Sequence, residues 1–288
     1  MIQPTVPPWF TQAIAHQPDK HSFTVNHARI SCFTWGKRSK PALILLHGGF
    51  ANSHWFSHIA PTLSTHHFII GLDFSGHGHS SWRDAYTFNT FIEELDATIC
   101  HFSLNEASLA GHSFGARIAF LFCQQHPFPI KQLFMLDPPK IHQIHQTLPA
   151  IAQNLSAKKT IKYYNHSESI TSRFRIIPPQ PIKNTYICDF IAKNSIKHSK
   201  NGFTWQADPN LFHKFYHPTQ KSPSMPQPLP QSSIIVHGEH SSIATEQTID
   251  SICTHHPNIK TIMLKNSHHA LMIDQPLKLL STLEKNLL

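Results

Sequence analysis

ASLAGHSFGARIAFLFCQQ, residues 107–125, is the stretch that decides the fold. An apolar run typical of a buried strand, ASLA at 107–110, leads into Gly111-His112-Ser113-Phe114-Gly115 and then into a segment of helical length at 114–125. G-x-S-x-G between a strand and a helix is typical of a strained turn that raises a serine above a sheet, with glycines where a side chain would collide with the neighbouring elements. We therefore expect Ser113 to be a nucleophile; the alternative is a serine that only caps the helix.

Similar apolar runs recur along the chain on both sides of this turn. They are ALILL (42–46), HFIIGLD (67–73), QLFMLD (132–137), SIIVHG (233–238) and TIMLKN (261–266). Continuous apolar runs are typical of parallel strands buried on both faces, and segments of helical length such as 86–101 separate them. The pattern predicts an α/β fold with an open, mostly parallel sheet flanked by helices. Before it, SFTVN (22–26) and ARISCFTW (28–35) predict a hairpin that turns at Asn26-His27.

One stretch interrupts the alternation of strands and helices. Residues 138–230 separate two predicted strands by far more chain than one crossover helix needs, and they are rich in proline. We expect an inserted, mainly helical lid with a stiff return segment. The predicted organisation is a first core part at 1–137, the lid at 138–230 and a second core part at 231–288.

Composition excludes several classes of protein. With 40% hydrophobic and 14% charged residues, the chain is expected to be globular rather than disordered. The net charge is +8, but Lys and Arg look scattered, so we read the charge as diffuse background and expect no nucleic-acid partner. The 25 histidines show no zinc spacing and the five cysteines no C-x-x-C, so neither a metal, a cofactor nor a disulfide framework is expected. No signal peptide or membrane span is apparent, which favours a cytoplasmic protein.

Three further motifs stand where known hydrolases carry functional loops. His47-Gly48-Gly49-Phe50 follows the strand ALILL, DFSGHGHS occupies 73–80, and NSHHALMIDQP at 266–276 follows the last predicted strand. With the serine turn, these motifs resemble the α/β-hydrolase superfamily, in the lid-bearing group that includes esterases, lipases and carbon-carbon bond hydrolases. The resemblance covers residues 22–137 and 231–288.

The resemblance implies roles for several residues of these motifs. The backbone N–H groups of Gly49 and Phe114 would form an oxyanion hole, and Phe50 and His112 would face the substrate. His269 would be the general base, because relatives show H-x-x-x-x-[DE]-x-P at this place and His269 stands seven residues before Pro276. The DFSGHGHS loop is expected to be structural.

The acid of the triad departs from the common pattern. Most relatives carry an aspartate three residues after the glycine of SIIVHG, where this chain has Ser241. Asp137 is the preferred replacement, since some lipases of this fold take their acid from an LDP context like Leu136-Asp137-Pro138. Glu239 is the alternative, and a dyad without a carboxylate also stays open.

The expected activity is hydrolysis of a carboxylic ester or a related small-molecule acyl substrate through an acyl-enzyme intermediate, as in a carboxylesterase. Two alternatives remain: a carbon-carbon bond hydrolase acting on a dienoate or diketone, and a weakly active, ligand-binding pseudoenzyme. Neither the substrate nor the oligomeric state follows from the motifs.

Overall fold

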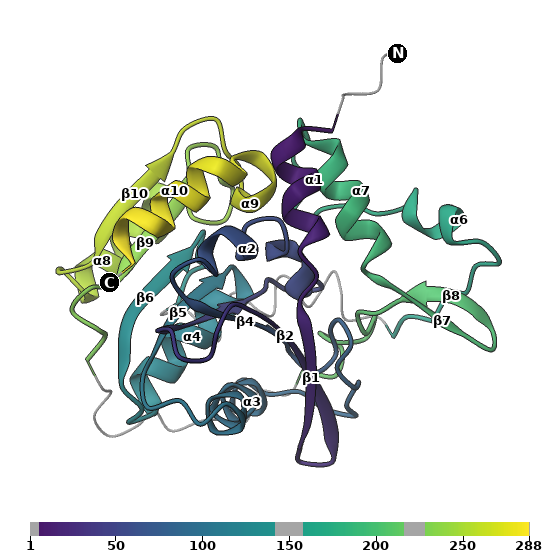
Figure 1. Ribbon diagram of the computed structural model, residues 1–288, viewed down its shortest axis with the longest axis horizontal. Coiled ribbons are helices and arrows are strands. Elements are labelled where there is room, and N and C mark those ends of the chain that lie inside the picture. The colour runs from purple at the N-terminus through teal and green to yellow at the C-terminus, as the bar shows by residue number, and fades with distance from the viewer. Residues whose placement is uncertain (1–5, 142–157, 216–227, 288) are drawn as a thin grey trace.

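The computed structural model describes residues 6–141, 158–215 and 228–287, and within these ranges eight strands form one sheet in the order β1-β2-β4-β3-β5-β6-β9-β10 (Figure 1). The strands of this sheet are β1 (Asp19–Val25), β2 (Ala28–Trp35), β3 (Ala42–Leu46), β4 (Phe68–Asp73), β5 (Ala107–His112), β6 (Ile130–Leu136), β9 (Ile234–Gly238) and β10 (Lys260–Leu264). The helices around it are α1 (Pro8–Ala15), η1 (Ser53–Phe56), α2 (Ala60–Leu63), α3 (Phe88–His101), α4 (Phe114–Gln125), α8 (Glu246–His255), α9 (Leu271–Asp274) and α10 (Pro276–Asn286).

The sheet has an antiparallel edge and a parallel body. β1 pairs with β2 and β2 with β4 in antiparallel fashion, whereas every pair from β4 through β3, β5, β6 and β9 to β10 is parallel. The predicted hairpin is also present: Val25 pairs with Ala28, and the φ angles of Asn26 and His27 are 46° and 63°. Two consecutive positive φ values are typical of the tight turn that suits the twist of a hairpin. The predicted α/β fold is therefore confirmed.

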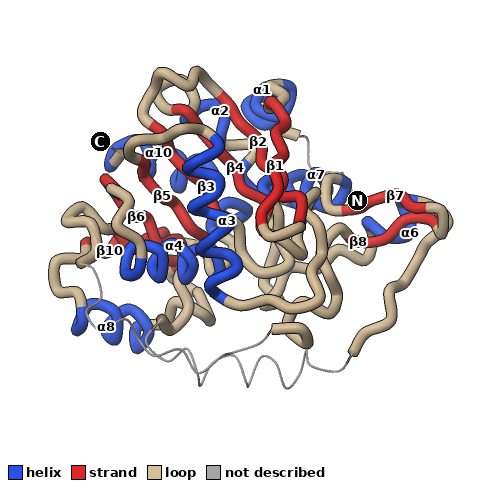
Figure 2. Tube along the Cα trace, turned by 90° about the horizontal axis from the view of Figure 1, so that it is seen from below, coloured by secondary structure: helices blue, strands red, loops and turns tan. Residues whose placement is uncertain are grey.

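The central strands are apolar without interruption because both of their faces are buried. In β3, Leu43 and Leu45 belong to one apolar cluster, together with residues of α1, α2 and α10. Ile44 and Leu46 belong to a second cluster, together with residues of α3, α4 and α8. Figure 2 shows α3 and α4 lying across the sheet on this second side. Successive side chains of a strand point to opposite faces, so a layer of helices on each face demands apolar residues at every position.

The described part of the predicted insertion, residues 158–215, lies beside the sheet at the right of Figure 1. It contains α6 (Ser167–Thr171), α7 (Thr185–Lys193) and an antiparallel hairpin, β7 (Ile196–Ser199) with β8 (Gly202–Trp205), which the sequence analysis did not predict. Residues 142–157 and 216–227, which include most of the proline-rich return segment, lie outside the described residues, so the boundaries at 138 and 230 stay predictions.

Hydrogen bonds join this part of the chain to loops of the core. Asn52 Nδ2, after β3, donates to the carbonyl of Asn194 at 3.1 Å, and the Tyr86 hydroxyl donates to Asp208 Oδ2 at 2.9 Å. Asn184 Nδ2 donates to the carbonyl of Ile273, in α9, at 2.8 Å. The insertion is thus fixed to the chain segments that follow β3, β4 and β10.

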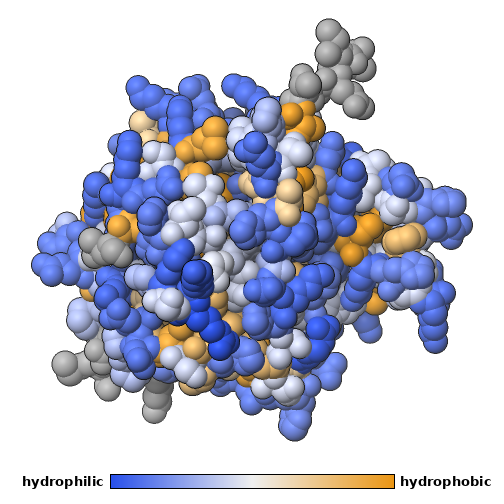
Figure 3. Space-filling model, viewed as in Figure 1, coloured by the Kyte–Doolittle hydropathy of each residue, from blue (hydrophilic) through white to orange (hydrophobic). Residues whose placement is uncertain are grey.

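The face of the molecule in Figure 3 is mainly hydrophilic, and its apolar side chains occur in small separate groups. Large apolar side chains with at least 45% of their surface exposed are few among the described residues: Val6, Ile177, Met263 and Leu277. In the same part of the chain, every helix is too short or too polar to cross a bilayer.

Five buried or nearly buried histidines have pKa values below the ordinary range. Burial lowers the pKa of His54, His58 and His77 from 6.5 to about 4, and it lowers the pKa of His47 and His112 well below 6.5. Between these values and 6.5 the unfolded chain binds more protons than the folded protein. The free energy of unfolding contributed by these groups is therefore complete above pH 6.5 and decreases as the pH falls towards 4.

Acidification is accordingly expected to destabilise the protein. Each of the three histidines with a pKa near 4 lowers the free energy of unfolding by roughly 1 kcal/mol between pH 7.5 and 5.5, so the three together contribute a few kcal/mol. Buried Asp73 and Glu94, whose pKa burial raises, act in the opposite direction but are outnumbered. Urea unfolding followed by tryptophan fluorescence at pH 7.5, 6.5 and 5.5 measures the effect.

His58→Gln is the control for this expectation. His58 Nε2 lies 2.7 Å from the carbonyl of Met272, and a glutamine can still donate a hydrogen bond there while it does not titrate. The variant should show a shallower pH dependence of unfolding than the parent protein. An unfolding free energy that stays constant from pH 7.5 to 5.5 would contradict the expectation.

Candidate active site

Ser113 lies between the end of β5 and the start of α4, in the turn that the G-x-S-x-G motif predicts. Its φ and ψ angles are 52° and −111°, a strained combination for a residue with a side chain. A Cβ atom on Gly111 would come within 2.4 Å of the carbonyl oxygen of Gly115, and one on Gly115 would come within 2.3 Å of the carbonyl oxygen of Leu46. Both glycines are therefore required by close packing of the backbone, and the serine stands at the carboxyl end of the sheet.

The loop after β3 runs alongside this turn. A Cβ atom placed on Gly48 would be 3.5 Å from the Cβ of Ser113, and one placed on Gly49 would be 4.0 Å from the Cβ of Phe114. Among the described residues, the backbone N–H groups of Gly49 and Phe114 donate no hydrogen bond. Two unused donors thus lie close to the serine, one of them at the amino end of α4 where the helix dipole favours negative charge.

His47 fixes the conformation of this loop. It is fully buried, and its Nε2 accepts a hydrogen bond from the backbone N–H of Phe74 at 3.1 Å. Its Nδ1, which lies 2.8 Å from the carbonyl oxygen of Gly48, is therefore the nitrogen that carries the proton. Burial keeps the pKa of His47 well below 6.5, so this neutral tautomer persists at neutral pH. His47 thereby ties the glycine loop to the segment that follows β4.

His269 and Asp137 lie in direct contact. His269 follows β10, Asp137 follows β6, and the distance from His269 Nδ1 to Asp137 Oδ2 is 2.6 Å. Asp137 is fully buried and His269 is 4% exposed. Within the described part of the chain, the hydroxyl of Ser113 makes no hydrogen bond to His269. Such bonds are often long or poorly aligned before a substrate binds.

Asp137 accepts two further hydrogen bonds besides the one from His269. The backbone N–H of Gly238 donates to Oδ1 at 2.9 Å, and the hydroxyl of Ser241 donates to Oδ2 at 2.6 Å. The same hydroxyl oxygen accepts from the backbone N–H groups of Ile243 and Ala244, at 3.1 and 3.0 Å. Ser241 stands where relatives carry the acid, and here its side chain supports the carboxylate of Asp137.

Glu239, the alternative acid, and His268, the histidine next to His269, have other partners. Glu239 Oε2 accepts a hydrogen bond from the backbone N–H of Asn266 at 2.8 Å, and its carboxylate is not in contact with His269 in the described structure. His268 Nδ1 lies 3.1 Å from Asp274 Oδ2, and its side chain is 28% exposed. Of the two neighbouring histidines, the one that contacts Asp137 is His269.

His112 packs beneath the loop that carries His269. Its ring lies 4.6 Å from the ring of His269 and 6.2 Å from that of Trp55, and its Nε2 lies 2.9 Å from the carbonyl oxygen of His269. Because that partner is a carbonyl, Nε2 carries the proton. Burial, followed by the nearby charge of His269, keeps the pKa of His112 well below 6.5. A neutral His112 leaves only one positive charge to be accommodated when His269 is protonated.

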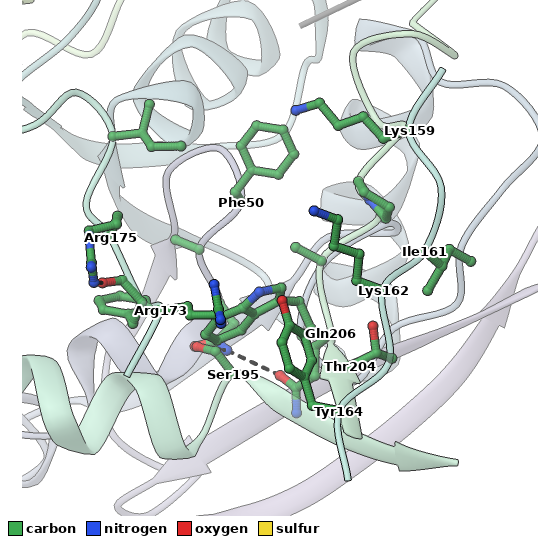
Figure 4. A pocket seen from close by; sticks show the side chains of 18 of the residues that line it. Phe50, Lys159, Ile161, Lys162, Tyr164, Arg173, Arg175, Ser195, Thr204 and Gln206 are labelled. Atoms are coloured by element: carbon green, nitrogen blue, oxygen red, sulfur yellow. Dashed lines mark hydrogen bonds between the residues drawn. The ribbon is translucent and has the colours of Figure 1, made fainter. Parts of the chain in front are cut away.

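A cavity of about 600 Å³ opens beside the loop after β3 (Figure 4). Phe50, one of the two residues expected to face the substrate, is part of its lining. The other, His112, is not among the described residues that line it, so a contact between His112 and substrate stays a prediction. Phe174 lies between the cavity and the surroundings of His112: it lines the cavity, and its ring lies 6.4 Å from the ring of Trp55, which packs near His112.

Two polar residues of this region were not recognised from the sequence as contributors. Ser241 was noted only as a missing acid, although its hydroxyl reaches Asp137. Gln180, in the insertion, accepts a hydrogen bond from the backbone N–H of Ala270 at 2.9 Å and donates to Asp274 Oδ1 at 3.0 Å. No local pattern marks Gln180, because its contacts depend on how the insertion folds back. It holds the loop that carries His269.

The histidines do not gather into a metal site in the part of the chain that the structure describes. No group of three or more His, Cys, Asp or Glu side chains there is arranged to hold a metal ion. All five cysteines are free thiols.

Comparison with known proteins agrees with the fold. Residues 41–276 match the family model described as alpha/beta hydrolase fold, and the chain therefore belongs to this family. A human "Serine hydrolase-like protein" is 31% identical over 113 residues, which are 38% of this chain and 56% of that protein. The chain thus spans little more than half the length of this relative.

Solved structures extend the likeness in fold to nearly the whole chain. The "Thioesterase Domain From Curacin Biosynthetic Pathway" superimposes with a TM-score of 0.73 at 20% identity, covering 93% of this chain and 99% of that one. "E-2-(Acetamidomethylene)succinate Hydrolase" gives a TM-score of 0.75 at 17% identity, covering 93% and 98%. At these identities the comparison establishes the shared fold.

Proposed function

We propose that the protein is a serine hydrolase in which Ser113, His269 and Asp137 form the catalytic triad, and that it cleaves a carboxylic ester or a related acyl substrate through an acyl-enzyme intermediate. The observation that carries this proposal is the 2.6 Å hydrogen bond between the buried His269 Nδ1 and Asp137 Oδ2. Asp137 directly follows Leu136, whose carbonyl accepts a hydrogen bond at 2.9 Å from the backbone N–H of Ser113, the residue in the strained turn. A histidine with only a structural role needs no buried carboxylate on one ring nitrogen. Relatives named as serine hydrolase-like proteins support the same reaction class.

The reaction follows from these positions. Asp137 holds His269 in the tautomer with the proton on Nδ1, so that Nε2 can take the proton of the Ser113 hydroxyl as its oxygen attacks the carbonyl carbon. The N–H groups of Gly49 and Phe114 bind the oxyanion that forms. His269 then gives its proton to the leaving oxygen, and water, activated by the same histidine, releases the acid and regenerates Ser113.

We also propose that residues 138–230 act as a lid between two core parts, 1–137 and 231–288. Gln180 supports this division, since it reaches from the insertion to the backbone of Ala270, next to His269. The cavity supports it as well, because its lining combines Phe50 of the core with residues of the insertion such as Phe174.

A fluorophosphonate probe tests the proposed nucleophile directly, because only an activated serine reacts quickly with it. We expect complete modification of one residue, Ser113, at micromolar probe, identified by mass spectrometry of the digested protein. Ser103 is an internal control, since its φ of 53° is as unusual as that of Ser113 while its place is at the end of α3. A folded protein that takes up no probe would favour the pseudoenzyme alternative.

A further inference from the structure

Four basic side chains line the cavity beside the loop after β3. They are Lys159, Lys162, Arg173 and Arg175, and the lining that the structure describes includes no aspartate or glutamate. Figure 4 shows Lys159 and Lys162 on one side and Arg173 on another, with the Lys159 nitrogen beside the Phe50 ring and the Lys162 nitrogen between Phe50 and Gln206. Arg175 lies at the edge and donates to the carbonyls of Ser172 and Phe174, at 3.0 and 2.7 Å.

Lys159, Lys162 and Arg173 are exposed side chains at the cavity, and no carboxylate of the described residues neutralises them. Among the described residues, no ion pair includes Lys159, Lys162 or Arg173. The guanidinium of Arg173 lies over the ring of Tyr164, 5.6 Å from its centroid, a contact that orients the cation without cancelling its charge. Lys159 is held through its backbone, which exchanges hydrogen bonds of 2.6 and 2.9 Å with the side chain of Asn210. The cavity therefore carries positive charge that the carboxylates of the described residues do not compensate.

The charge of the whole chain is concentrated in the same region. Residues 138–230 contain 12 Lys and Arg against 3 Asp and Glu, whereas the remaining residues contain 12 against 13, so the insertion carries +9 and the core −1. The interpretation of the net charge as diffuse background is therefore wrong. A cavity under a strongly positive segment attracts anionic small molecules and raises their local concentration.

The rest of the lining is suited to an acyl group. Phe50, Phe174 and Trp205 provide apolar walls. At the floor, the buried side chain of Asn52 donates to Ser195 Oγ and to Gln206 Oε1, both at 3.2 Å, so polar groups there satisfy one another. A ligand that fills this cavity can thus place apolar carbons against the aromatic walls and needs an anionic group to engage the cations.

We propose that the substrate of this hydrolase carries an anionic group, a carboxylate or a phosphate, that Lys159, Lys162 and Arg173 bind while the carbonyl carbon lies at Ser113. This inference rests on the proposed function and names its substrate class. Ser113 and His269 are not among the described residues that line the cavity; Phe50, which lines it, directly follows Gly49, the proposed oxyanion donor.

Two ester substrates that differ only in the anionic group test the inference. Mono-p-nitrophenyl adipate and p-nitrophenyl hexanoate have the same chain length, and only the first ends in a carboxylate. We expect kcat/KM to be roughly 10- to 100-fold higher for the adipate ester, the range of one or two charge-assisted hydrogen bonds, and the preference to decline with added salt. Equal values for the two esters would overturn the inference while leaving the proposed function intact.

Charge-reversal variants show which side chains cause the preference for the adipate ester. Lys162→Glu and Arg173→Glu should each raise KM for the adipate ester about tenfold or more, so that the ratio of kcat/KM for the adipate ester to that for the hexanoate ester falls by about the same factor. Lys200→Glu is the matched control, because Lys200 is an exposed lysine of the same insertion that is not part of the cavity lining. An equal loss in Lys200→Glu would show that the overall field of the insertion is responsible, and the assignment to the cavity would fall.

Two further measurements are needed. The first asks whether the anionic group is a phosphate of the leaving group, and the second tests binding of the anion even if the protein hydrolyses neither ester. A phosphate in the leaving group is tested with hexanoyl-coenzyme A against hexanoyl-pantetheine, in place of the adipate pair. Calorimetric titration with hexanoate and its neutral amide, hexanamide, needs no catalysis, and hexanoate should bind at least roughly tenfold more tightly, with the difference lost in Lys162→Glu. If neither ester is hydrolysed, the proposed function fails, and this titration alone decides whether the anion site exists.

Discussion

Replacing Ser113 with alanine is expected to lower kcat/KM for a short p-nitrophenyl ester by about four to six orders of magnitude. The substitution removes the only atom that can form the acyl-enzyme, while His269, Asp137 and the N–H groups of Gly49 and Phe114 keep their positions. The residual rate would come from binding and the oxyanion hole alone. Stopped assays with 4-nitrophenyl butyrate, with product release read at 400 nm or so, cover this range if the enzyme concentration is raised to compensate.

Ser113→Gly separates loss of chemistry from loss of structure. The φ of 52° and ψ of −111° cost a residue with a side chain roughly 1–3 kcal/mol, and glycine avoids most of that cost. We expect this variant to be as inactive as Ser113→Ala but to unfold at a higher temperature than the parent protein. Substantial ester hydrolysis by either variant would remove Ser113 from the mechanism.

The features that the sequence predicted well are local. The strand, turn and helix around Ser113 are encoded within residues 107–125, and α4 begins and ends at the residues expected, Phe114 and Gln125. The glycines of this motif predict the backbone packing because the collisions they avoid are with the next few residues and one adjacent strand. In the same way, Asn26-His27 predicts a hairpin turn from two residues.

From the sequence, Asp137 was preferred as the acid over Glu239, with a dyad also left open, but no local pattern could decide between them. Asp137 and His269 are 132 positions apart, and their contact depends on β6 and β9 lying side by side in the sheet. The role of Ser241 depends on the same arrangement, since its loop follows β9 and bends back over Asp137. Spacing alone carries no information about which strands become neighbours.

The residues that line the cavity could not be predicted from local sequence patterns either. Lys162 and Arg173 are separated from Phe50 by more than a hundred residues, and only the folded insertion brings them to one space. Their charge was nonetheless available from the sequence, because a count by segment rather than over the whole chain reveals the imbalance. The net charge of the whole chain does not reveal that the insertion is strongly positive while the core is nearly neutral.

The second large loss of activity is expected when the carboxylate of Asp137 is replaced by an amide. Asp137→Asn should lower kcat about 10³- to 10⁴-fold with little change in KM, because a neutral amide neither stabilises the imidazolium of His269 nor reliably holds the proton on Nδ1. Ser241→Ala should cost only about tenfold, since Asp137 retains its hydrogen bonds from Gly238 and His269. Steady-state kinetics on the p-nitrophenyl ester gives both values.

Glu239→Gln is the matched control for Asp137→Asn, since it makes the same chemical change on the loop where relatives carry the acid. Glu239 accepts a hydrogen bond from the backbone of Asn266, so its loss should change kcat less than about threefold. A larger fall in Glu239→Gln than in Asp137→Asn would reverse the assignment of the acid.

The double variant Asp137→Asn, Ser241→Asp moves the carboxylate to the position it occupies in most relatives. Ser241 Oγ and His269 Nδ1 each lie 2.6 Å from the same oxygen of Asp137, so a carboxylate at position 241 starts within reach of the imidazole. We expect it to recover at least about tenfold of the activity lost in Asp137→Asn. Recovery would mean that the site requires a negative charge at His269 Nδ1 and tolerates either strand end as its source, whereas no recovery would mean that the backbone around Asp137, with its φ of 47°, is needed to aim it.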